Sequence, residues 1–209
     1  MEESGRTTIG RNTGKNGTVN ENDASRRFTS SLFYRVMAPI MAKVLESPLR
    51  RRVNDADRIM DGAGIQPGTQ VLEAGCGTGY FTLPAARRIG ETGHLYSTDI
   101  SPQAIDFVRD KVGASGLRNI SPGIADAKAT GIPDATCDMV LLFGVVPAPM
   151  LPLALLLPEM HRVLKPEGVL AVWPSIPLWM RSAFTKSGQF AFEGKINGVM
   201  RFRKIDKKL

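Results

Sequence analysis

A glycine-rich segment that directly follows an apolar run holds the residues whose types and spacing best fit ligand chemistry. Residues 71–80 read Val-Leu-Glu-Ala-Gly-Cys-Gly-Thr-Gly-Tyr, so a carboxylate stands two residues before the first of three alternating glycines. Glycines between a strand and a helix allow a tight turn and let a ligand approach the backbone without a Cβ in the way. In a doubly wound sheet this turn lies at the carboxyl edge, where ligands bind. The segment predicts a ligand site; the alternative is a tight turn that binds nothing.

The spacing of these glycines excludes two common nucleotide-binding loops. The dinucleotide fingerprint needs a glycine three residues after its second glycine, a position that Tyr80 holds here. The segment also lacks the Gly-Lys-Ser or Gly-Lys-Thr ending of a phosphate loop. The carboxylate of Glu73 disfavours a pyrophosphate and favours a cationic ligand. Further along, Asp99 can accept both hydroxyls of a ribose, while it or Ser101 can also cap the following helix.

The elements that must position these residues alternate between strands and helices. Strands are predicted at 71–73, 94–98, 120–124, 139–143 and 169–173, and helices at 53–60 (ending at Asp61-Gly62), at 80–89, at 102–115 and up to about Leu164. This alternation is typical of a parallel sheet with helices on both faces. Asn197-Gly198, between strands predicted at 189–196 and 199–205, indicates a hairpin. The expected α/β fold is a doubly wound, mainly parallel, seven-stranded sheet with a C-terminal antiparallel hairpin.

Composition divides the chain into three predicted parts. Residues 1–27 are rich in Gly, Asn, Thr, Ser and charge, and are predicted to be a disordered polar tail. Residues 28–65 are predicted to form a helical cap on the substrate side, because apolar residues recur at helical spacing between positions 32 and 49. Residues 66–209 are then predicted to form the α/β domain.

The charge of the chain is concentrated in its flanks. The 209 residues carry a formal net charge of +7, with eight basic and two acidic residues in 181–209 against eight basic and eleven acidic residues in 61–180. The basic flanks can face RNA phosphates, an anionic membrane surface or only solvent. With 43% hydrophobic and 22% charged residues, the composition is typical of one soluble globular domain.

The cysteines and histidines carry no metal-ligand spacing, so neither a metal site nor a disulfide scaffold is expected. Cys76 follows the first predicted strand and Cys137 precedes the fourth, which places them at opposite edges of the sheet, too far apart to pair. The N-terminal residues lack the apolar stretch of a secretory signal, which predicts a cytoplasmic protein. Residues 139–158 are uncharged and long enough to span a membrane, but four prolines argue against the helix that a span needs.

Several segments, taken in order, resemble the S-adenosylmethionine-dependent methyltransferases of the Rossmann-like class, of the small-molecule, quinone or lipid type. The segments are Val71 to Gly79, Tyr96 to Pro102, Ala125-Asp126-Ala127, Cys137 to Val140 and Glu159 to Gly168. The resemblance implies methyl transfer with S-adenosylmethionine as the cofactor. The residues that it implies for cofactor binding are Glu73, Gly75, Cys76, Gly77, Gly79, Asp99, Ile100, Asp126, Ala127 and Phe143.

The resemblance also implies a role for the individual positions. It places Glu73, Gly75 and Gly77 by the methionine part of the cofactor, and Ile100 against the adenine, whose exocyclic amine and ring nitrogen would meet the Asp126 carboxylate and the Ala127 amide. Asp138, His94 and His161 are expected to be structural. No catalytic residue is assigned, because a sulfonium methyl is already activated and the main task is alignment.

Substrate choice in such a fold depends on what is added to the sheet. The apolar segment 143–151 with Val146, and Phe33, Tyr34 and Met37 from the N-terminal part, are predicted to line the acceptor side, or else to be ordinary core. The chain lacks the Asn-Pro-Pro-Tyr or Asp-Pro-Pro-Tyr of resembling enzymes that methylate nucleic-acid bases. A small apolar acceptor, quinone-like or lipid, is therefore favoured over nucleic acid. The alternatives are an RNA methyltransferase that uses the basic flanks and a catalytically inactive cofactor-binding module; the oligomeric state is not predicted.

Overall fold

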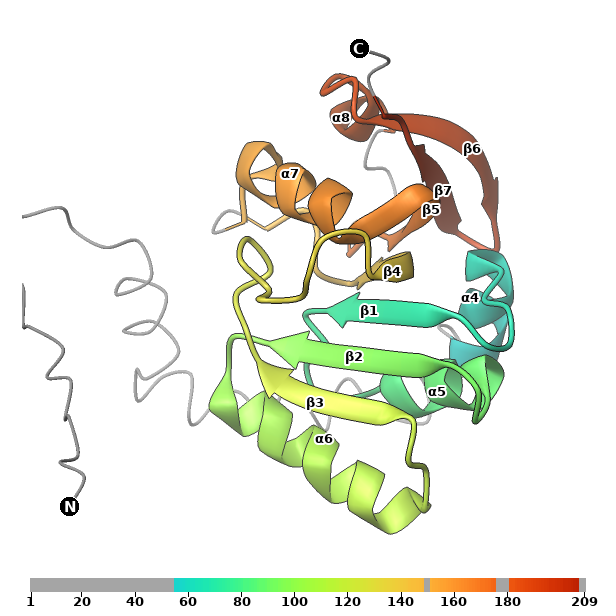
Figure 1. The fold of residues 1–209 in the computed structure, drawn as a ribbon, viewed down its shortest axis with the longest axis vertical. Helices are drawn as coiled ribbons and strands as arrows, with labels where there is room; N and C mark the ends of the chain where they lie inside the picture. The colour runs from blue at the N-terminus through green and yellow to red at the C-terminus, as the bar shows by residue number, and fades with distance from the viewer. Residues whose placement is uncertain (1–54, 149–150, 176–180, 207–209) are drawn as a thin grey trace, which may run out of the picture.

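The computed structural model describes residues 55–148, 151–175 and 181–206, which form a seven-stranded sheet in the order β3-β2-β1-β4-β5-β7-β6 (Figure 1). The strands are β1 (Gln70–Ala74), β2 (His94–Asp99), β3 (Ile120–Ile124), β4 (Cys137–Phe143), β5 (Leu164–Trp173), β6 (Phe190–Ile196) and β7 (Val199–Lys204). The first five run parallel, and β7 pairs antiparallel with β5 and β6. The predicted fold class is confirmed. The predicted tail and the helices at 32–49 lie outside the described residues, as do Phe33, Tyr34 and Met37.

Helices cover both faces of this sheet. They are α4 (Ala56–Ala63), α5 (Thr82–Ile89), α6 (Pro102–Ser115), α7 (Leu153–Val163) and α8 (Ser182–Thr185). Successive residues of a strand point to opposite faces, and the core divides accordingly. Val140 and Leu142 belong to the apolar cluster that contains α7, whereas Leu141 belongs to the cluster that contains α4 and α5. Both faces are therefore apolar, as expected for a parallel sheet.

The end of α4 differs from the prediction. The helix does not stop at Asp61-Gly62 but continues to Ala63, with Gly64 as a left-handed C-cap. Gly62 therefore lies inside the helix. A side chain at this position would be too close to the hairpin, because a Cβ would come within 2.4 Å of the Ile196 carbonyl oxygen. This glycine therefore permits close packing of α4 against the terminal hairpin and does not end the helix.

Two strands and one helix also have boundaries that differ from the prediction. β4 begins at Cys137, which pairs with Leu164 at the start of β5, and both strands start earlier than expected. The register shifts after Cys137, where Asp138 turns to the Lys165 ammonium at 2.7 Å. α5 begins at Thr82 and not at position 80. In contrast, α6 has the predicted bounds, and the Ser101 hydroxyl accepts a hydrogen bond from the Ala104 N–H at its start.

Within the uncharged stretch 139–158, residues 139–143 belong to β4 and residues 153–158 form the first half of α7. None of the helices in the described part of the chain has the length and apolar character needed to cross a membrane.

Candidate functional site

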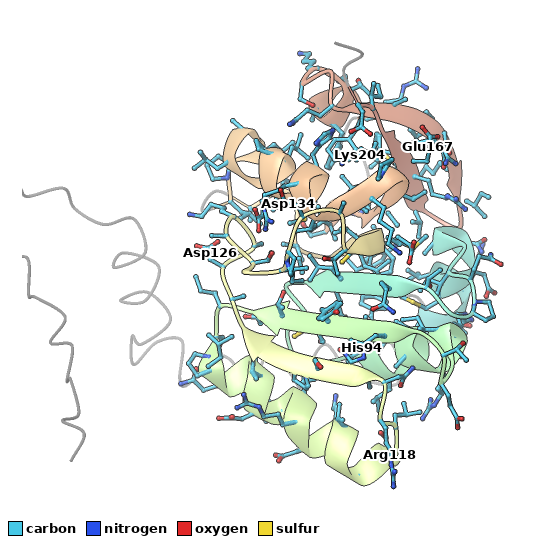
Figure 2. The ribbon with its side chains drawn as sticks, in the orientation of Figure 1. His94, Arg118, Asp126, Asp134, Glu167 and Lys204 are labelled. Atoms are coloured by element: carbon cyan, nitrogen blue, oxygen red, sulfur yellow. The ribbon has the colours of Figure 1, made fainter. Side chains whose placement is uncertain are left out.

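Four chain segments that carry predicted site residues meet at the carboxyl edge of the sheet. The glycine segment follows β1, Asp99 ends β2, Asp126 follows β3 and Phe143 ends β4. Because these strands are parallel and adjacent, their ends lie at one edge. Figure 2 shows Asp126 at this edge and Arg118, which precedes β3, at the opposite end of the sheet.

The glycine segment is fixed by backbone hydrogen bonds and by the loop after β4. The N–H groups of Gly75 and Cys76 donate to the Thr98 carbonyl oxygen at 2.8 and 2.9 Å. Gly75 has a φ of +79°, and a Cβ there would lie 2.6 Å from a methyl group of Val145. Gly77 has a φ of +53°, and a Cβ there would meet no atom within 4 Å. Gly75 therefore allows close packing of two loops, while the backbone at Gly77 stays open to a ligand.

The Asp99 carboxylate joins the glycine segment to the start of α6. One oxygen accepts the Gly77 N–H and the other accepts the Ser101 N–H, both at 2.9 Å. Burial raises the pKa of Asp99, although the hydrogen bonds from Ser101 and Gly77 act in the opposite direction. A carboxylate oxygen can accept more than one hydrogen bond. Asp99 is therefore held in place and retains acceptor capacity for hydroxyl groups.

Glu73 lies almost entirely within the protein. Its side chain points toward α5 and β2, where one carboxylate oxygen accepts from the Thr82 hydroxyl at 2.6 Å and the Ser97 hydroxyl at 2.9 Å. Burial raises the pKa of Glu73 to about 7, and these two hydrogen bonds limit the increase. Sequence reasoning missed Thr82 and Ser97. The signal available was a carboxylate within a buried strand, which requires nearby donors.

Asp126 and Ala127 form a tight turn after β3. One Asp126 oxygen accepts the Lys128 N–H at 2.9 Å, and the other lies 3.7 Å from the Lys128 ammonium. Ala127 packs against the core cluster beneath α7. Ile100 is half-buried after β2. These three residues lie at the same edge of the sheet as the glycine segment.

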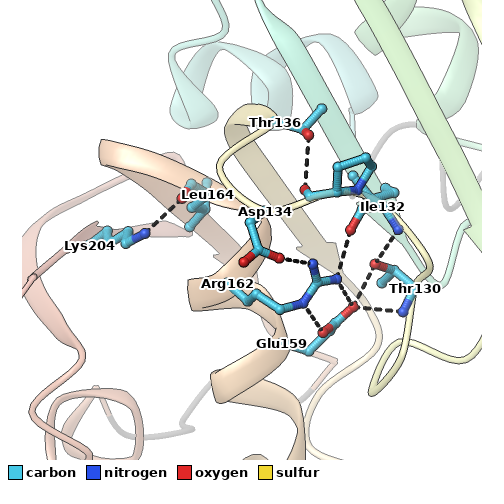
Figure 3. Close-up of polar contacts among 9 residues, drawn as sticks. Thr130, Ile132, Asp134, Thr136, Glu159, Arg162, Leu164 and Lys204 are labelled. Atoms are coloured by element: carbon cyan, nitrogen blue, oxygen red, sulfur yellow. Dashed lines mark hydrogen bonds and ion pairs between the residues drawn. The ribbon is translucent and has the colours of Figure 1, made fainter.

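The connection from β3 to β4 is tied to α7 by an ion pair between the buried Glu159 and the half-buried Arg162 (Figure 3). A Glu159 oxygen accepts both the N–H and the hydroxyl of Thr130 at 2.7 Å. Arg162 donates to Glu159 at 2.8 Å and to the Ile132 carbonyl at 2.7 Å. Burial favours the neutral acid, but the hydrogen bonds from Arg162 and Thr130 lower the pKa of Glu159 to about 2. The motif around Glu159 and Arg162 thus holds the segment that follows Asp126, a role that sequence reasoning missed.

Aromatic residues form the floor of the carboxyl edge. The Phe143 ring is buried and meets the Phe81 ring edge-on, with centroids 5.2 Å apart, and Phe81 also meets Trp173 at 5.8 Å. Val146 is fully buried in the core cluster beneath α7, and its carbonyl accepts the Ser175 N–H at 2.9 Å.

Three residues expected to be structural have partners that account for them. Asp138 accepts the Gln70 N–H at 2.8 Å and pairs with Lys165 at the start of β4. His161 Nε2 lies 2.9 Å from the Ile205 carbonyl oxygen, and His94 Nε2 lies 2.8 Å from the Ser121 hydroxyl.

Comparison with known proteins agrees with this geometry. The protein family described as "Methyltransferase domain" matches residues 71–168, from the start of the glycine segment to the middle of β5. The chain carries a Rossmann-like methyltransferase domain. The predicted resemblance is confirmed, and S-adenosylmethionine is the cofactor of this family.

Relatives of this chain extend the match beyond the family region. Ubiquinone/menaquinone biosynthesis C-methyltransferase UbiE of Laribacter hongkongensis is 33% identical over 166 residues, which are 78% of this chain and 65% of that protein. Demethylmenaquinone methyltransferase of Listeria welshimeri is 36% identical over 120 residues, 55% of this chain and 50% of that protein. The chain thus spans about half to two thirds of the length of these curated relatives.

A solved structure shows the same fold. The SAM dependent methyltransferase from Aquifex aeolicus aligns with a TM-score of 0.67 and 20% identity, covering 80% of this chain and 98% of that chain.

Proposed function

We propose that this chain binds S-adenosylmethionine at the carboxyl edge of its sheet and transfers the methyl group to a small, apolar, quinone-like acceptor. The observation that carries the proposal is the 166-residue match to the ubiquinone/menaquinone C-methyltransferase. That match is much longer than the family region at 71–168, so it includes parts of the chain outside the cofactor motifs. In this fold such parts select the acceptor.

The cofactor-binding residues in this proposal are Glu73, Gly75, Cys76, Gly77, Gly79, Asp99, Ile100, Asp126, Ala127 and Phe143. The fixed Asp99 carboxylate supports ribose binding because both of its oxygens can accept further donors. The open backbone at Gly77 supports close approach of the methionine part. The Coulomb interaction of a Glu73 carboxylate favours a sulfonium over a neutral thioether.

The cofactor, when bound, supplies a methyl group that is already activated as part of a sulfonium. The chain must align an acceptor with that methyl group and exclude water. The buried rings of Phe143 and Phe81 and the half-buried ring of Trp173 support this, because they offer an apolar environment without competing nucleophiles. We place Phe33, Tyr34 and Met37 on the acceptor side, whereas Val146 is fully buried in the core cluster beneath α7. Each buried acceptor methylene would contribute about 0.8 kcal/mol.

The charges of the terminal hairpin count against the RNA alternative. Arg203 donates to Glu193 and lies 3.6 Å from a Glu167 oxygen. Lys204 is only 9% exposed and donates to the Leu164 carbonyl at 2.8 Å (Figure 3). These cations serve the contact between β5, β6 and β7, so they are poorly placed to hold phosphates.

The test is a methyl-transfer assay with methyl-labelled S-adenosylmethionine and an acceptor panel that contains demethylmenaquinone, a lipid extract and RNA. We expect mass spectrometry to find the label in the quinone ring compound, and acceptor binding to change little between low and physiological salt. Label in RNA alone, with affinity that falls steeply with salt, would replace this proposal by the RNA methyltransferase. Cofactor binding without label in any acceptor would favour the inactive binding module.

A further inference from the structure

The outward side of α7 lacks the polar residues that normally cover a solvent-facing helix. Residues 151–158 contain no charged or hydrogen-bonding side chain. Leu156 and Leu157 are buried, yet Leu155 on the other side is 45% exposed. The remaining exposed residues of this half-helix are Pro152, Ala154 and Pro158. A helix that is apolar on both sides is normally covered on both sides.

A groove between α7 and α8 continues this apolar surface. It encloses about 260 Å³ and is lined by Leu153, Ala154, Leu157, Pro158, Ala183, Lys186, Ser187 and Gln189. We call the exposed residues 152, 154, 155 and 158, together with this groove, the α7–α8 surface. Within the described chain, α7 contributes apolar side chains to this surface, and Arg181 and Lys186 stand on either side of α8.

Two exposed cations flank the α7–α8 surface. Lys186 lines the groove and Arg181 precedes α8, and both side chains are exposed. The acidic residues near α7 are paired with other cations: Glu159 and Asp134 with Arg162, and Asp206 with Lys204 at 3.4 Å. Arg181 lies over the Phe192 ring, and among the described residues neither it nor Lys186 has an acidic partner. The α7–α8 surface therefore combines exposed apolar side chains with two cations that no acidic side chain of the described chain neutralises.

We propose that the α7–α8 surface docks on an anionic lipid bilayer. Leu155 and its apolar neighbours would enter the boundary between headgroups and acyl chains, while Arg181 and Lys186 would meet headgroup phosphates. Apolar side chains flanked by cations are the combination that binds membrane interfaces. A two-fold dimer on the same surface would instead bring identical cations toward each other, which is unfavourable. Charge thus favours lipid over a second copy of this chain.

The α7–α8 surface lies on the side of the molecule where the proposed cofactor site is. α7 follows β4 in the chain, so the apolar first half of α7 is the end of the helix nearest the carboxyl edge of the sheet. Docking there would bring the site toward the bilayer. The inference goes beyond the proposed function and is tested by membrane binding alone.

The experiment is flotation of the full chain with phosphatidylcholine vesicles, with and without about 30 mol% phosphatidylglycerol. We expect the wild type to float with the anionic vesicles, and Leu155→Glu to reduce its partition coefficient at least about fivefold. The matched control is Ile196→Glu. Ile196 is 54% exposed and pairs with Val199 on the sheet face opposite α7, so this variant should float like the wild type.

A second variant tests the charges independently. Arg181→Gln with Lys186→Gln should lose about tenfold in binding to the anionic vesicles and little in binding to phosphatidylcholine alone. A wild type that stays in solution, or a Leu155→Glu variant that floats like the wild type, would overturn the proposal. So would light scattering that shows a wild-type dimer separated by Leu155→Glu. Calorimetry with S-adenosylmethionine on each variant reports the proposed function separately.

Discussion

Asp99 is the side chain on which ribose recognition depends in this account. Its carboxylate already bridges Gly77 and Ser101, so a ligand would meet it in a fixed position. Asp99→Ala removes charge-assisted hydrogen bonds worth about 1.5–3 kcal/mol each, and we expect affinity for S-adenosylmethionine and its demethylated product to fall at least about tenfold. Calorimetry measures this directly. Asp106→Ala, at an exposed position on α6, is the matched control and should bind like the wild type; equal loss in both variants would contradict the assignment.

Glu73 makes the stability of the fold depend on pH near neutrality. Burial raises its pKa from 4.5 to about 7, so the native state holds this proton more tightly than the unfolded state. The stabilisation that the Glu73 proton contributes to the free energy of unfolding is fully present below pH 4.5 and is lost as pH rises through about 7. It amounts to about 3 kcal/mol. Glu73→Gln retains an oxygen acceptor for Thr82 and Ser97 but cannot ionise. We expect urea unfolding between pH 5 and 8 to show a decline in wild-type stability that the variant lacks.

The acid range gives an internal control for the Glu73 prediction. The lowered pKa of Glu159 adds stability that is present above pH 4.5 and is lost as pH falls toward 2, so the two effects occupy different windows. A pH dependence between 5 and 8 that is identical in wild type and Glu73→Gln would show that Glu73 is not the group responsible.

At the scale of elements, the ion pair between Glu159 and Arg162 on α7 holds the connection between β3 and β4. Arg162→Met would leave the Glu159 carboxylate buried with Thr130 as its remaining donor, and breaking a buried pair costs about 3–5 kcal/mol. We expect urea denaturation to show a loss near the lower end of that range. Arg109→Met, which removes an exposed pair within α6, should change stability by less than about 1 kcal/mol. Similar losses in the two variants would mean that the pair on α7 does not carry this role.

The elements that could be predicted from the sequence are those with strong local signals. Ser101-Pro102 starts α6 at the expected residue, and Asn197-Gly198 forms the turn of the predicted hairpin. The glycine segment and Asp99 also follow from local pattern, because a parallel sheet brings the ends of its strands to one edge.

What could not be predicted depends on contacts between distant elements. Gly62 has the local signature of a helix end, but the helix continues past it, and the space for a Cβ is taken by the Ile196 carbonyl of the distant hairpin. The partners of Glu73 come from α5 and β2, and no spacing rule identifies Thr82 or Ser97 before the fold is known. The same holds for Val145, whose contact with Gly75 joins two loops that are far apart in sequence.

At the scale of the whole molecule, the two thiols report on global unfolding. Cys76 and Cys137 are both free and buried. Burial raises the pKa of Cys137 to about 12 and raises that of Cys76 further from neutrality, so neither forms a reactive thiolate in the native state. We expect no labelling by a thiol reagent in buffer at neutral pH, and labelling of both in denaturant without prior reduction. Denatured protein that needs a reductant before it labels would show that the thiols had paired.

The distribution of charge changes how the net charge of +7 should be interpreted. Arg203 and Lys204 of the hairpin are engaged by Glu193, Glu167 and backbone carbonyls, so they stabilise the sheet edge. Arg181 and Lys186 remain exposed beside an apolar helix. A basic composition is therefore weak evidence for nucleic acid here, and the placement of each cation is the more informative quantity.

The most direct test of the account is a calorimetric titration of the wild-type chain with S-adenosylmethionine, its demethylated product and NAD. All three ligands contain an adenosine, so the titration tests whether the site beside the glycine segment selects ligands that carry the methionine end. We expect saturable binding of the first two ligands at one site and no saturable binding of NAD. Absence of heat with both methionine-derived ligands, or binding of NAD in their place, would contradict it.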